Sequence, residues 1–375
     1  MPVLLLVGAG HAHLYVVQHA ADLVAAGYQV HLLAPRFFDY SGVASAAAAG
    51  ALPTDTGRID VRSLSEARGV QFHEDTLAAC DLTARIATTS RGVRLSYNVL
   101  SINIGSVVAP TGMQVDPAVL RVKPLSDLAD LDARLRDLWS RASGHQGATV
   151  TVVGAGASGL ELAAHLAIRP DVAQIQLVES GRMIGADLPS GARRRIMALL
   201  TARGVQIRTG CAVRDLGGRD LVCVDGTELS HDVALLAVGL TTPPLLADLG
   251  LASGDGRGVP VRATLQHVDR DEIYAVGDCA YFLPRPLPRI GVHGVRQGPV
   301  LLQSLLARIR GEALPVYEPQ RRALSILDVG DGVGLSVWGR LWWCGAASLR
   351  LKRSIDRRWL RTYQQPGAPA TSGSH

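Results

Sequence analysis

Two stretches of this 375-residue chain share one pattern of hydrophobic and polar positions. Each begins with an apolar or β-branched run, residues 3–7 or 149–153, that leads into a glycine-rich turn. A helical stretch rich in Ala and Leu follows, and then a second apolar run, residues 28–33 or 175–178. Continuous apolar strands that alternate with helices are typical of a parallel sheet covered on both faces. The repeated pattern therefore predicts two βαβ units, and hence two nucleotide-binding domains in one chain.

The remaining apolar segments complete the predicted architecture. We expect strands at residues 92–100, 102–104, 233–238, 273–276, 323–329 and 335–338, and helices at 125–139 and 292–310, followed by a basic helix that contains tryptophan. The expected fold class is α/β, with two Rossmann-like dinucleotide-binding domains, the second inserted in the first, and a C-terminal module. The expected boundaries are 1–118 and 265–314 for the first domain, 119–264 for the second, and 315–375 for the C-terminal module with a flexible end.

The second glycine turn is a complete GxGxxG motif between a predicted strand and a predicted helix. Its glycines permit a tight turn, a close approach of the backbone to a pyrophosphate, and close packing of the helix on the strand. An acid is expected about 20 residues further on, where it binds the ribose hydroxyls, and Glu179 ends the second strand there. A carboxylate repels a 2′-phosphate, so Glu179 favours NADH over NADPH, although Arg182 nearby leaves NADPH open. The expected contacts of this site are Gly154, Gly156, Ala157, Ser158, Gly159 and Glu179.

The first glycine turn is less complete. His13 stands where the motif has its third glycine, and the second strand ends at residues 33–36 without a ribose-binding acid. By itself this turn is equally consistent with a nucleotide site and with a packing turn. A third segment, the AVGD sequence at residues 275–278, follows another apolar strand. Its aspartate can hydrogen-bond a polyol hydroxyl, although a plain turn explains the same residues.

The order of these three segments resembles that of flavoproteins with two dinucleotide-binding domains, the pyridine nucleotide-disulfide oxidoreductase-like FAD/NAD(P)-binding proteins. Within them the chain is most similar to type II NADH dehydrogenases and to the flavoprotein domain fused to selenophosphate synthetases. The resemblance covers residues 1–363, and it is carried by GAGHAH (8–13), YSG (40–42), SINIGS (101–106), VKP (122–124), AVGD (275–278), GVRQGPVL (294–301) and IDR (355–357).

The resemblance implies that the first site binds FAD and the second binds NADH. The FAD contacts it implies are Gly8, Ala9, Gly10, His11, Ala12, Gly105, Lys123, Gly277 and Asp278. Lys123 either contacts the flavin or pairs with an acid at the surface. The implied activity is transfer of a hydride from NADH to the flavin and of electrons onward to a quinone or another small acceptor.

Two further residues match functional positions of the type II dehydrogenases. Glu161 matches a glutamate near the nicotinamide and the flavin, although an acid in the first turn of a helix is also favoured by the helix dipole. Gln297 matches the glutamine on the quinone side of those enzymes, although it also fits a helix position near the flavin pyrimidine. We therefore name Glu161 and Gln297 as candidate catalytic residues.

The chain also departs from this family. Residues 43–46 replace a Pro-Gly segment that follows YSG in the family, which leaves open a nucleotide-bound redox sensor or partner module with little turnover. The five cysteines include no CxxC or CxxxxC pair, so neither a zinc site nor a redox disulfide between neighbouring cysteines is expected. No metal site is expected.

Charge draws attention to the end of the chain. The formal net charge is +5, but residues 340–375 hold seven basic residues and only Asp356 as an acid, so their share is +6 and that of residues 1–339 is −1. Apolar positions recur every four residues at Trp343, Ala347, Leu351, Ile355, Trp359 and Tyr363, and basic residues flank them at Arg350, Lys352, Arg353, Arg357, Arg358 and Arg361. This pattern is typical of a helix in an anionic lipid interface, or of a helix packed on its own protein with Arg stems over the apolar positions.

Composition limits the remaining classes of function. A hydrophobic fraction of 47% with 19% charged residues excludes a disordered or fibrous protein. No apolar stretch is long enough for a membrane span or a signal peptide. No nucleic-acid-binding pattern accompanies the positive charge. The expected location is therefore the cytoplasm, with peripheral attachment to the inner face of the membrane through residues 342–363 as an open alternative.

Overall fold

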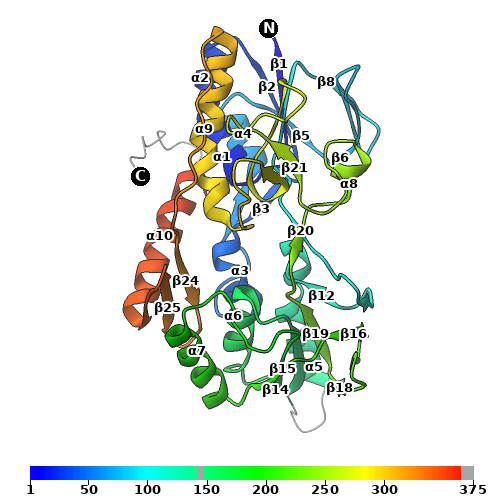
Figure 1. The fold of residues 1–375 in the computed structure, drawn as a ribbon, viewed down its shortest axis with the longest axis vertical. Helices are drawn as coiled ribbons and strands as arrows, with labels where there is room; N and C mark the ends of the chain where they lie inside the picture. Colours follow the sequence, from blue (N-terminus) through cyan, green and yellow to red (C-terminus); the bar gives the residue numbers. More distant parts are fainter. Residues whose placement is uncertain (142–146, 365–375) are drawn as a thin grey trace.

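The computed structural model describes residues 1–141 and 147–364. The chain forms two lobes, each built around a parallel sheet, and a C-terminal helix lies at their side (Figure 1). The predicted α/β fold class with two Rossmann-like domains is confirmed by this architecture. The expected flexible end, residues 365–375, lies outside the described residues.

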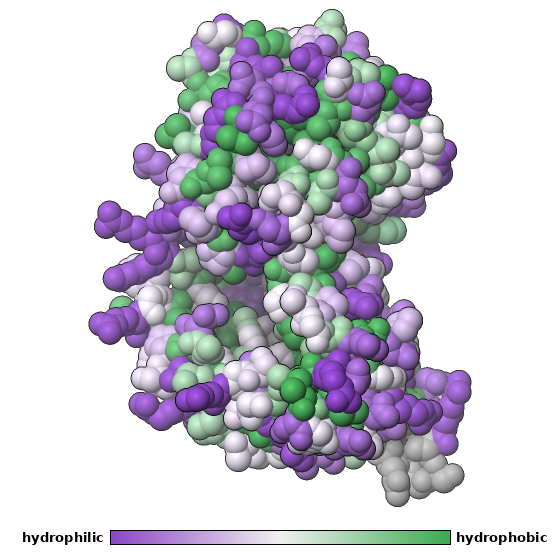
Figure 2. Space-filling model, turned by 45° about the vertical axis from the view of Figure 1, so that its right-hand side comes forward, coloured by the Kyte–Doolittle hydropathy of each residue, from purple (hydrophilic) through white to green (hydrophobic). Residues whose placement is uncertain are grey.

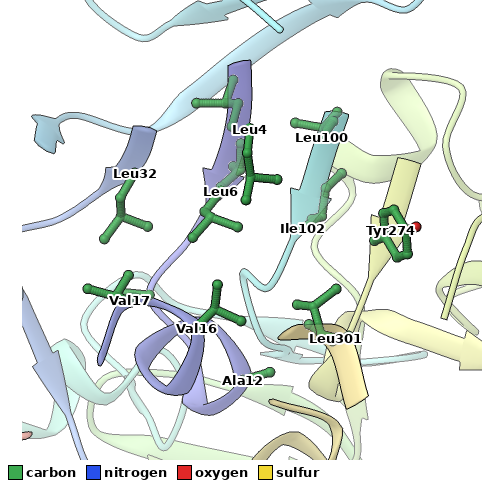
Figure 3. Close-up of a cluster of buried hydrophobic side chains, with 14 of the residues drawn as sticks. Leu4, Leu6, Ala12, Val16, Val17, Leu32, Leu100, Ile102, Tyr274 and Leu301 are labelled. Atoms are coloured by element: carbon green, nitrogen blue, oxygen red, sulfur yellow. The ribbon is translucent and has the colours of Figure 1, made fainter. Parts of the chain in front are cut away.

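The first sheet has five parallel strands. Their order is β22 (Ile273–Ala275), β9 (Val99–Ile102), β1 (Val3–Val7), β2 (Gln29–Ala34) and β5 (Gln71–Glu74). Helices α1 (His11–Gln18) and α9 (Gly291–Arg310) pack together against it. Figure 3 shows Leu6 and Ile102 of the sheet above Val16 of α1 and Leu301 of α9. All four side chains are fully buried, so this core fixes the position at which β1 turns into α1.

The second sheet repeats this arrangement. Its parallel strands are β12 (Leu120–Arg121), β19 (Val233–Leu236), β13 (Ala148–Val153), β14 (Val172–Glu179) and β15 (Gln206–Thr209). Helix α6 (Ala157–Leu166) follows β13, and α7 (Ser190–Ala202) lies beyond β14. A smaller sheet adjoins it, with β11 (Gln114–Val115), β16 (Val213–Leu216), β17 (Asp220–Cys223) and β18 (Glu228–Ser230).

The chain passes between the domains through two adjacent strands. β10 (Val107–Val108) leads into the second domain, and it pairs antiparallel with β20 (Leu240–Thr241), which leads back. Beyond β20, Leu246 and Val259 join the hydrophobic core of the first sheet. The segment from β20 to residue 264, expected in the second domain, thus packs with the first.

The C-terminal module is a three-stranded antiparallel sheet followed by a long helix. The strands are β24 (Leu324–Asp328), β25 (Gly334–Trp338) and β26 (Leu341–Gly345), and the helix is α10 (Ala346–Gln364). Trp343 lies in β26, so the expectation that a single helix carries the apolar positions from Trp343 onward is wrong. Gly339, at φ +61°, permits the tight turn that pairs β26 with β25.

The helix α10 faces the body of the protein with a different set of residues from the one expected. Lys352 and Asp356 are buried, whereas Leu351 and Ile355 are 40% and 46% exposed. The expectation that Lys352 belongs to a basic surface flank is therefore wrong. Arg353 and Arg357 on the same helix are exposed, as expected.

The remaining elements connect these units. They are α2 (Ala20–Ala25), β3 (Phe37–Asp39), α3 (Ser41–Ala48), β4 (Arg58–Asp60), α4 (Val61–Ala67), β6 (Leu77–Asp81), β7 (Ile86–Thr89), β8 (Arg94–Ser96), η1 (Leu125–Leu128), α5 (Leu131–Arg141), α8 (Leu245–Asp248), β21 (Val259–Val261), η2 (Gly277–Cys279) and β23 (Ala280–Phe282). No helix within residues 1–141 and 147–364 is long and apolar enough to cross a membrane.

Candidate functional site

The second glycine turn joins β13 to α6. Gly154 has φ +102°, and a Cβ atom there would lie 2.5 Å from the carbonyl oxygen of Ala237. A Cβ atom on Gly159 would lie 1.9 Å from the carbonyl oxygen of Gly154. Only glycine fits at these two positions, because the backbone of the turn approaches β19 and α6 closely. No side chain caps the N-terminus of α6 at Gly156, so its first amides are free to donate to an anion.

Glu179 ends β14 directly beside this turn. One carboxylate oxygen accepts from the backbone N–H of Ala155 at 2.9 Å, and the other accepts from the N–H of Gly181 at 2.7 Å. These bonds hold the carboxylate at the position expected for an acid that binds ribose hydroxyls. Arg182 is exposed three residues further on.

A cavity of about 520 Å³ extends from this turn to the interface with the first domain. Its walls at one end are Gly156, Ser158 and Glu179, and at the other end are the start of α3 and the residues around Lys123 and Ile290. Figure 2 shows the surface hollowed between the two lobes. The cavity therefore extends from the second glycine turn to Lys123, one of the expected FAD contacts.

The first glycine turn joins β1 to α1. Gly8 has φ +84°, and Gly10, the N-cap of α1, has no side-chain cap. Gly291 and Gly294 at the start of α9 lie against His11, since a Cβ atom on either would come within 3.4 Å of the His11 side chain. The uncapped N-terminus of α1 therefore meets the beginning of α9 beside His11.

His13, which replaces the third glycine, points inward. Its Nδ1 lies 2.6 Å from the carbonyl oxygen of Gly8, and its Nε2 lies 2.8 Å from the Ser101 hydroxyl. A carbonyl oxygen can only accept, so Nδ1–H donates to Gly8 and Nε2 accepts from Ser101. The side chain is fully buried, and burial lowers the pKa of His13 to about 4. The neutral imidazole of His13 thus links the first glycine turn, through Gly8, to Ser101 of β9.

Asn103 is a residue of this site that the sequence analysis missed. Its side-chain oxygen accepts from the N–H of His13 at 3.3 Å, and its side-chain nitrogen donates to the carbonyl of Val276 at 2.8 Å. It thereby links the first glycine turn to the AVGD segment. Asn103 lies in the SINIGS segment (101–106), but the sequence alone does not show that its side chain joins two distant turns.

Lys123 and Asp278 form an ion pair at this site. The Lys123 Nζ donates to Asp278 at 2.7 Å and to the Ser106 hydroxyl at 3.0 Å, and Ser106 also donates to Asp278 at 2.7 Å. Burial alone would raise the pKa of Asp278, but the adjacent Lys123 and these hydrogen bonds keep it below its usual value. Lys123 and Asp278, two of the expected FAD contacts, thus lie together. Ser106, which bonds both, directly follows Gly105, and a Cβ atom built on Gly105 would have no atom within 4 Å.

Gln297 lies on α9 with 1% of its surface exposed. Its side-chain oxygen accepts from the N–H of Gly277 at 2.6 Å. The structure therefore places Gln297 against the turn that carries Asp278.

Glu161 lies on α6, behind the wall of the cavity. Its carboxylate accepts from the hydroxyl of Ser45 at 3.1 Å and from the N–H of Asp328 at 2.7 Å. Burial raises the pKa of Glu161, against the lowering effect of the charge on Lys352. Ser45 lines the cavity, so one side chain separates Glu161 from it.

The helix α10 reaches this region with a buried charge pair. The Lys352 Nζ donates to Asp356 at 2.9 Å and also to the carbonyl of Gly42. Asp356 accepts from the hydroxyl of Tyr40 at 2.9 Å. Burial and the charge of Asp356 raise the pKa of Tyr40, which keeps the hydroxyl protonated. The C-terminal helix is thus bound directly to the segment that starts α3.

Trp359 of α10 packs between Tyr40, which precedes α3, and His11, which begins α1. Its ring stacks on Tyr40 with centroids 4.5 Å apart, and it lies 5.0 Å from the ring of His11. Its Nε1–H is buried and has no hydrogen-bond partner among the described residues. Of the two arrangements expected for the apolar positions that include Trp359, a lipid interface or packing on the protein itself, Trp359 has the second.

These features fit FAD at the first site. The buried N–H of Trp359 and the first-turn amides of α1, apart from that of His13 which donates to Asn103, can donate to acceptors such as phosphate oxygens. No acid that could bind ribose hydroxyls directly follows β2. Arg36 occupies this position, and it forms an ion pair with Asp60 at 2.9 Å. Asp39 pairs with Arg58, also at 2.9 Å. The described residues contain no group of three metal-ligating side chains.

Comparison with known proteins agrees with this arrangement. The model of the family described as "Pyridine nucleotide-disulphide oxidoreductase" matches residues 3–298. The NADH dehydrogenase-like protein YutJ of Bacillus subtilis is 29% identical over 192 residues, 51% of this chain and 53% of that protein, so the chain spans about half of its length. The type II NADH:quinone oxidoreductase of Staphylococcus aureus is 22% identical over 381 residues, 94% of each chain. The solved structure of NDH2 from Plasmodium falciparum in complex with NADH has a TM-score of 0.80 at 13% identity, and covers 97% of this chain and 99% of that one, which shows a shared fold.

Proposed function

The chain belongs to the pyridine nucleotide-disulphide oxidoreductase family, and on this premise we propose that it transfers electrons from NADH through FAD to a quinone. The observation that carries the proposal is the cavity that runs from Glu179 to Lys123 and the start of α3. A nicotinamide bound through the second turn would meet a flavin held at the first within this one cavity. The names of the Bacillus and Staphylococcus relatives support NADH as the donor, and the name of the Staphylococcus relative supports a quinone as the acceptor.

The residues of the chain bind and orient the two cofactors. Bound FAD supplies the redox chemistry, since it accepts a hydride and releases electrons singly or in pairs. The amides at the start of α1 and the Trp359 Nε1–H would hold the diphosphate of FAD, and Asp278 with Lys123 would bind its polyol chain. The amides at the start of α6 would hold the diphosphate of NADH, and Glu179 its ribose.

Glu161 and Gln297 have different positions relative to the reacting region. Glu161 reaches the cavity through Ser45, and its raised pKa suits a group that holds a proton near the site. Gln297 fixes the Gly277 turn, so we assign it the positioning of Asp278.

One experiment tests the proposed reaction. NADH is added without oxygen to the purified yellow protein, and a soluble quinone follows. We expect rapid bleaching of the flavin and reoxidation by the quinone. A flavin that stays oxidised for minutes contradicts the enzyme and supports the redox sensor that residues 43–46 leave open. Protein that purifies without flavin contradicts the assignment of the first site.

The variant Glu179→Gln tests the nucleotide preference. We expect the KM for NADH to rise about 10-fold or more with kcat little changed, since a hydrogen bond to a charged group contributes about 1.5–3 kcal/mol. Discrimination against NADPH is expected to fall, because the repelling charge is lost. Steady-state kinetics with both nucleotides give the measurement. Asp187→Asn, at another acid of the cavity wall, is the control, and an unchanged KM for NADH in Glu179→Gln would refute the assignment.

We also propose that the outer side of the C-terminal module touches an anionic membrane. Leu341 and Trp343 of β26 are 60% and 40% exposed, Leu351 and Ile355 of α10 are 40% and 46% exposed, and the same module has six exposed arginines. Apolar and basic side chains on one surface are typical of interfacial binding. The exposed arginines are Arg340, Arg350, Arg353, Arg357, Arg358 and Arg361.

Liposome co-sedimentation tests this surface. We expect the triple variant Trp343→Ser, Leu351→Ser, Ile355→Ser to bind vesicles with anionic headgroups at least 5-fold more weakly, since each apolar side chain buried in lipid contributes about 1 kcal/mol or more. The control variant Val93→Ser, Val224→Ser changes two exposed apolar residues elsewhere, 52% and 67% exposed. Equal pelleting of the wild type and the triple variant would exclude this surface.

A further inference from the structure

Cys211 and Cys223 lie side by side in the second domain. They are 12 residues apart in the chain, yet their Cα atoms are 5.7 Å apart and their sulfurs are joined. Cys211 comes just before β16 and Cys223 ends β17, and the antiparallel pairing of these strands brings the two together. A Cα separation of this size is typical of disulfides. Cys80, Cys279 and Cys344 are free.

The pair differs from the free cysteines in its relation to the nucleotide cavity. Cys211 lines this cavity together with Glu179 and Val213. Cys223 is fully buried behind it, and Cys211 is 7% exposed. A small molecule in the cavity therefore reaches Cys211 first, and a bound nucleotide would cover it.

Backbone hydrogen bonds connect Cys211 to the residue expected to bind ribose. The N–H of Cys211 donates to the carbonyl of Glu179 at 3.1 Å, and the N–H of Gly210 donates to that of Gly181 at 2.8 Å. The carboxylate of Glu179 in turn accepts from Ala155 in the glycine turn. A movement of Cys211 is thus transmitted to both the ribose acid and the diphosphate turn.

We propose that Cys211 and Cys223 are a reversible thiol–disulfide switch that sets the affinity of the second dinucleotide site. The proposal rests on nucleotide binding at this site. In the disulfide form, the cross-link holds Cys211 and its loop against β17, and the cavity has the shape described above. In the dithiol form, the two sulfurs separate to van der Waals contact, and the loop with its bonds to Glu179 shifts. The cross-link restrains the loop that is bonded to Glu179, so less conformational freedom is lost on binding and the disulfide form binds nucleotide more tightly.

Thiol–disulfide exchange with a small disulfide such as oxidised glutathione supplies the oxidation. The thiolate of Cys211 attacks one sulfur of the small disulfide and releases one thiolate. Cys223 then loses its proton, and its thiolate attacks the Cys211 sulfur of the mixed disulfide and releases the second small thiolate. Two protein thiols thus lose two electrons and two protons, and one small disulfide becomes two thiols.

The affinity for NAD⁺ tests the switch directly. The purified holoprotein is treated with oxidised glutathione or with reduced glutathione, its thiols are counted by mass spectrometry after alkylation, and NAD⁺ binding is measured by calorimetry. We expect the dithiol form to bind at least 5-fold more weakly, the lower end of typical coupling between sites. Equal affinities of the two forms would overturn the switch and leave the proposed function standing. Absence of NAD⁺ binding to both forms would overturn the switch and the proposed function together.

Reciprocity gives a second measurement that needs no variant. If NAD⁺ binds the disulfide form 5-fold more tightly, saturating NAD⁺ lowers the midpoint potential of the pair by about 20 mV, since 10-fold corresponds to 29.6 mV for two electrons. Titration in glutathione buffers with and without NAD⁺ gives this shift. An unshifted midpoint contradicts the coupling.

Variants assign the effect to the two residues. We expect Cys211→Ser and Cys223→Ser to lose the response of NAD⁺ affinity to glutathione, whereas Cys80→Ser, at a free cysteine in another sheet, keeps the full response. A response that persists in Cys211→Ser overturns the proposal. If a variant fails to fold, the NAD⁺ affinities of the disulfide and dithiol forms of the wild type still decide whether the switch exists.

Discussion

The variant Lys352→Met is expected to lose about 3–5 kcal/mol of unfolding free energy, because it leaves the buried charge of Asp356 bonded to the Tyr40 hydroxyl but without a cation beside it. Lys352 and Asp356 are 9% and 6% exposed, and their side chains lie 2.9 Å apart. The variant also removes the donor to the carbonyl of Gly42 and the positive charge that acts on Glu161. Urea unfolding at constant pH, followed by circular dichroism, measures the loss.

Arg353→Met is the matched control for this prediction. Arg353 is the next residue of the same helix and is exposed, so its replacement is expected to change the unfolding free energy by less than about 1 kcal/mol. A loss in Lys352→Met no larger than in Arg353→Met would show that the pair does not stabilise the docking of α10 on the segment at Gly42.

The two glycine turns could be predicted from the sequence because the signals are local. A strand, a turn that only glycine tolerates, a helix and the acid Glu179 follow one another within about 30 residues of chain, the length of a βαβ unit. Each step of this pattern is set by backbone geometry, and the order of the turns along the chain then predicted the two-domain fold. At Gly154 and Gly159, a Cβ atom would clash with a backbone carbonyl oxygen, so the structure requires glycine at both positions, as the motif predicts.

Residues whose role depends on distant parts of the chain could not be predicted in this way. Asn103 joins two turns that are far apart in the sequence, and Cys211 meets Cys223 only through the pairing of β16 with β17. Trp359 and Lys352 face inward because α10 docks on Tyr40 and Gly42. Their neighbours Leu351 and Ile355 form an equally regular apolar row on the exposed side, so periodicity alone selects the wrong side.

The segment at α3 is where these interactions meet. Ser41 and Ser45 face the cavity, whereas Gly42 is bound by Lys352 of the C-terminal helix. Ser45 also bonds Glu161 of the second domain. The departure from the family at residues 43–46 thus lies where both domains and the C-terminal module contact one short helix, which makes this helix the position at which this chain is expected to differ from its relatives in reaction rate.

Acidification is expected to destabilise the protein through His13, by about 3 kcal/mol between pH 7 and pH 4. Burial lowers the pKa of this imidazole from 6.5 to about 4, so the unfolded chain binds a proton in this range and the folded one does not. The stability that the neutral ring contributes is complete above pH 6.5 and is lost as the pH falls toward 4. Unfolding free energies of the wild type and of His13→Gln across this range measure the effect, and the variant is expected to lack this part of the pH dependence.

Ser101→Ala is the control, because it removes the hydroxyl bonded to Nε2 but keeps the titrating ring, so its pH dependence should follow the wild type. Identical pH dependence in the wild type and His13→Gln would contradict a buried neutral His13 at the first glycine turn.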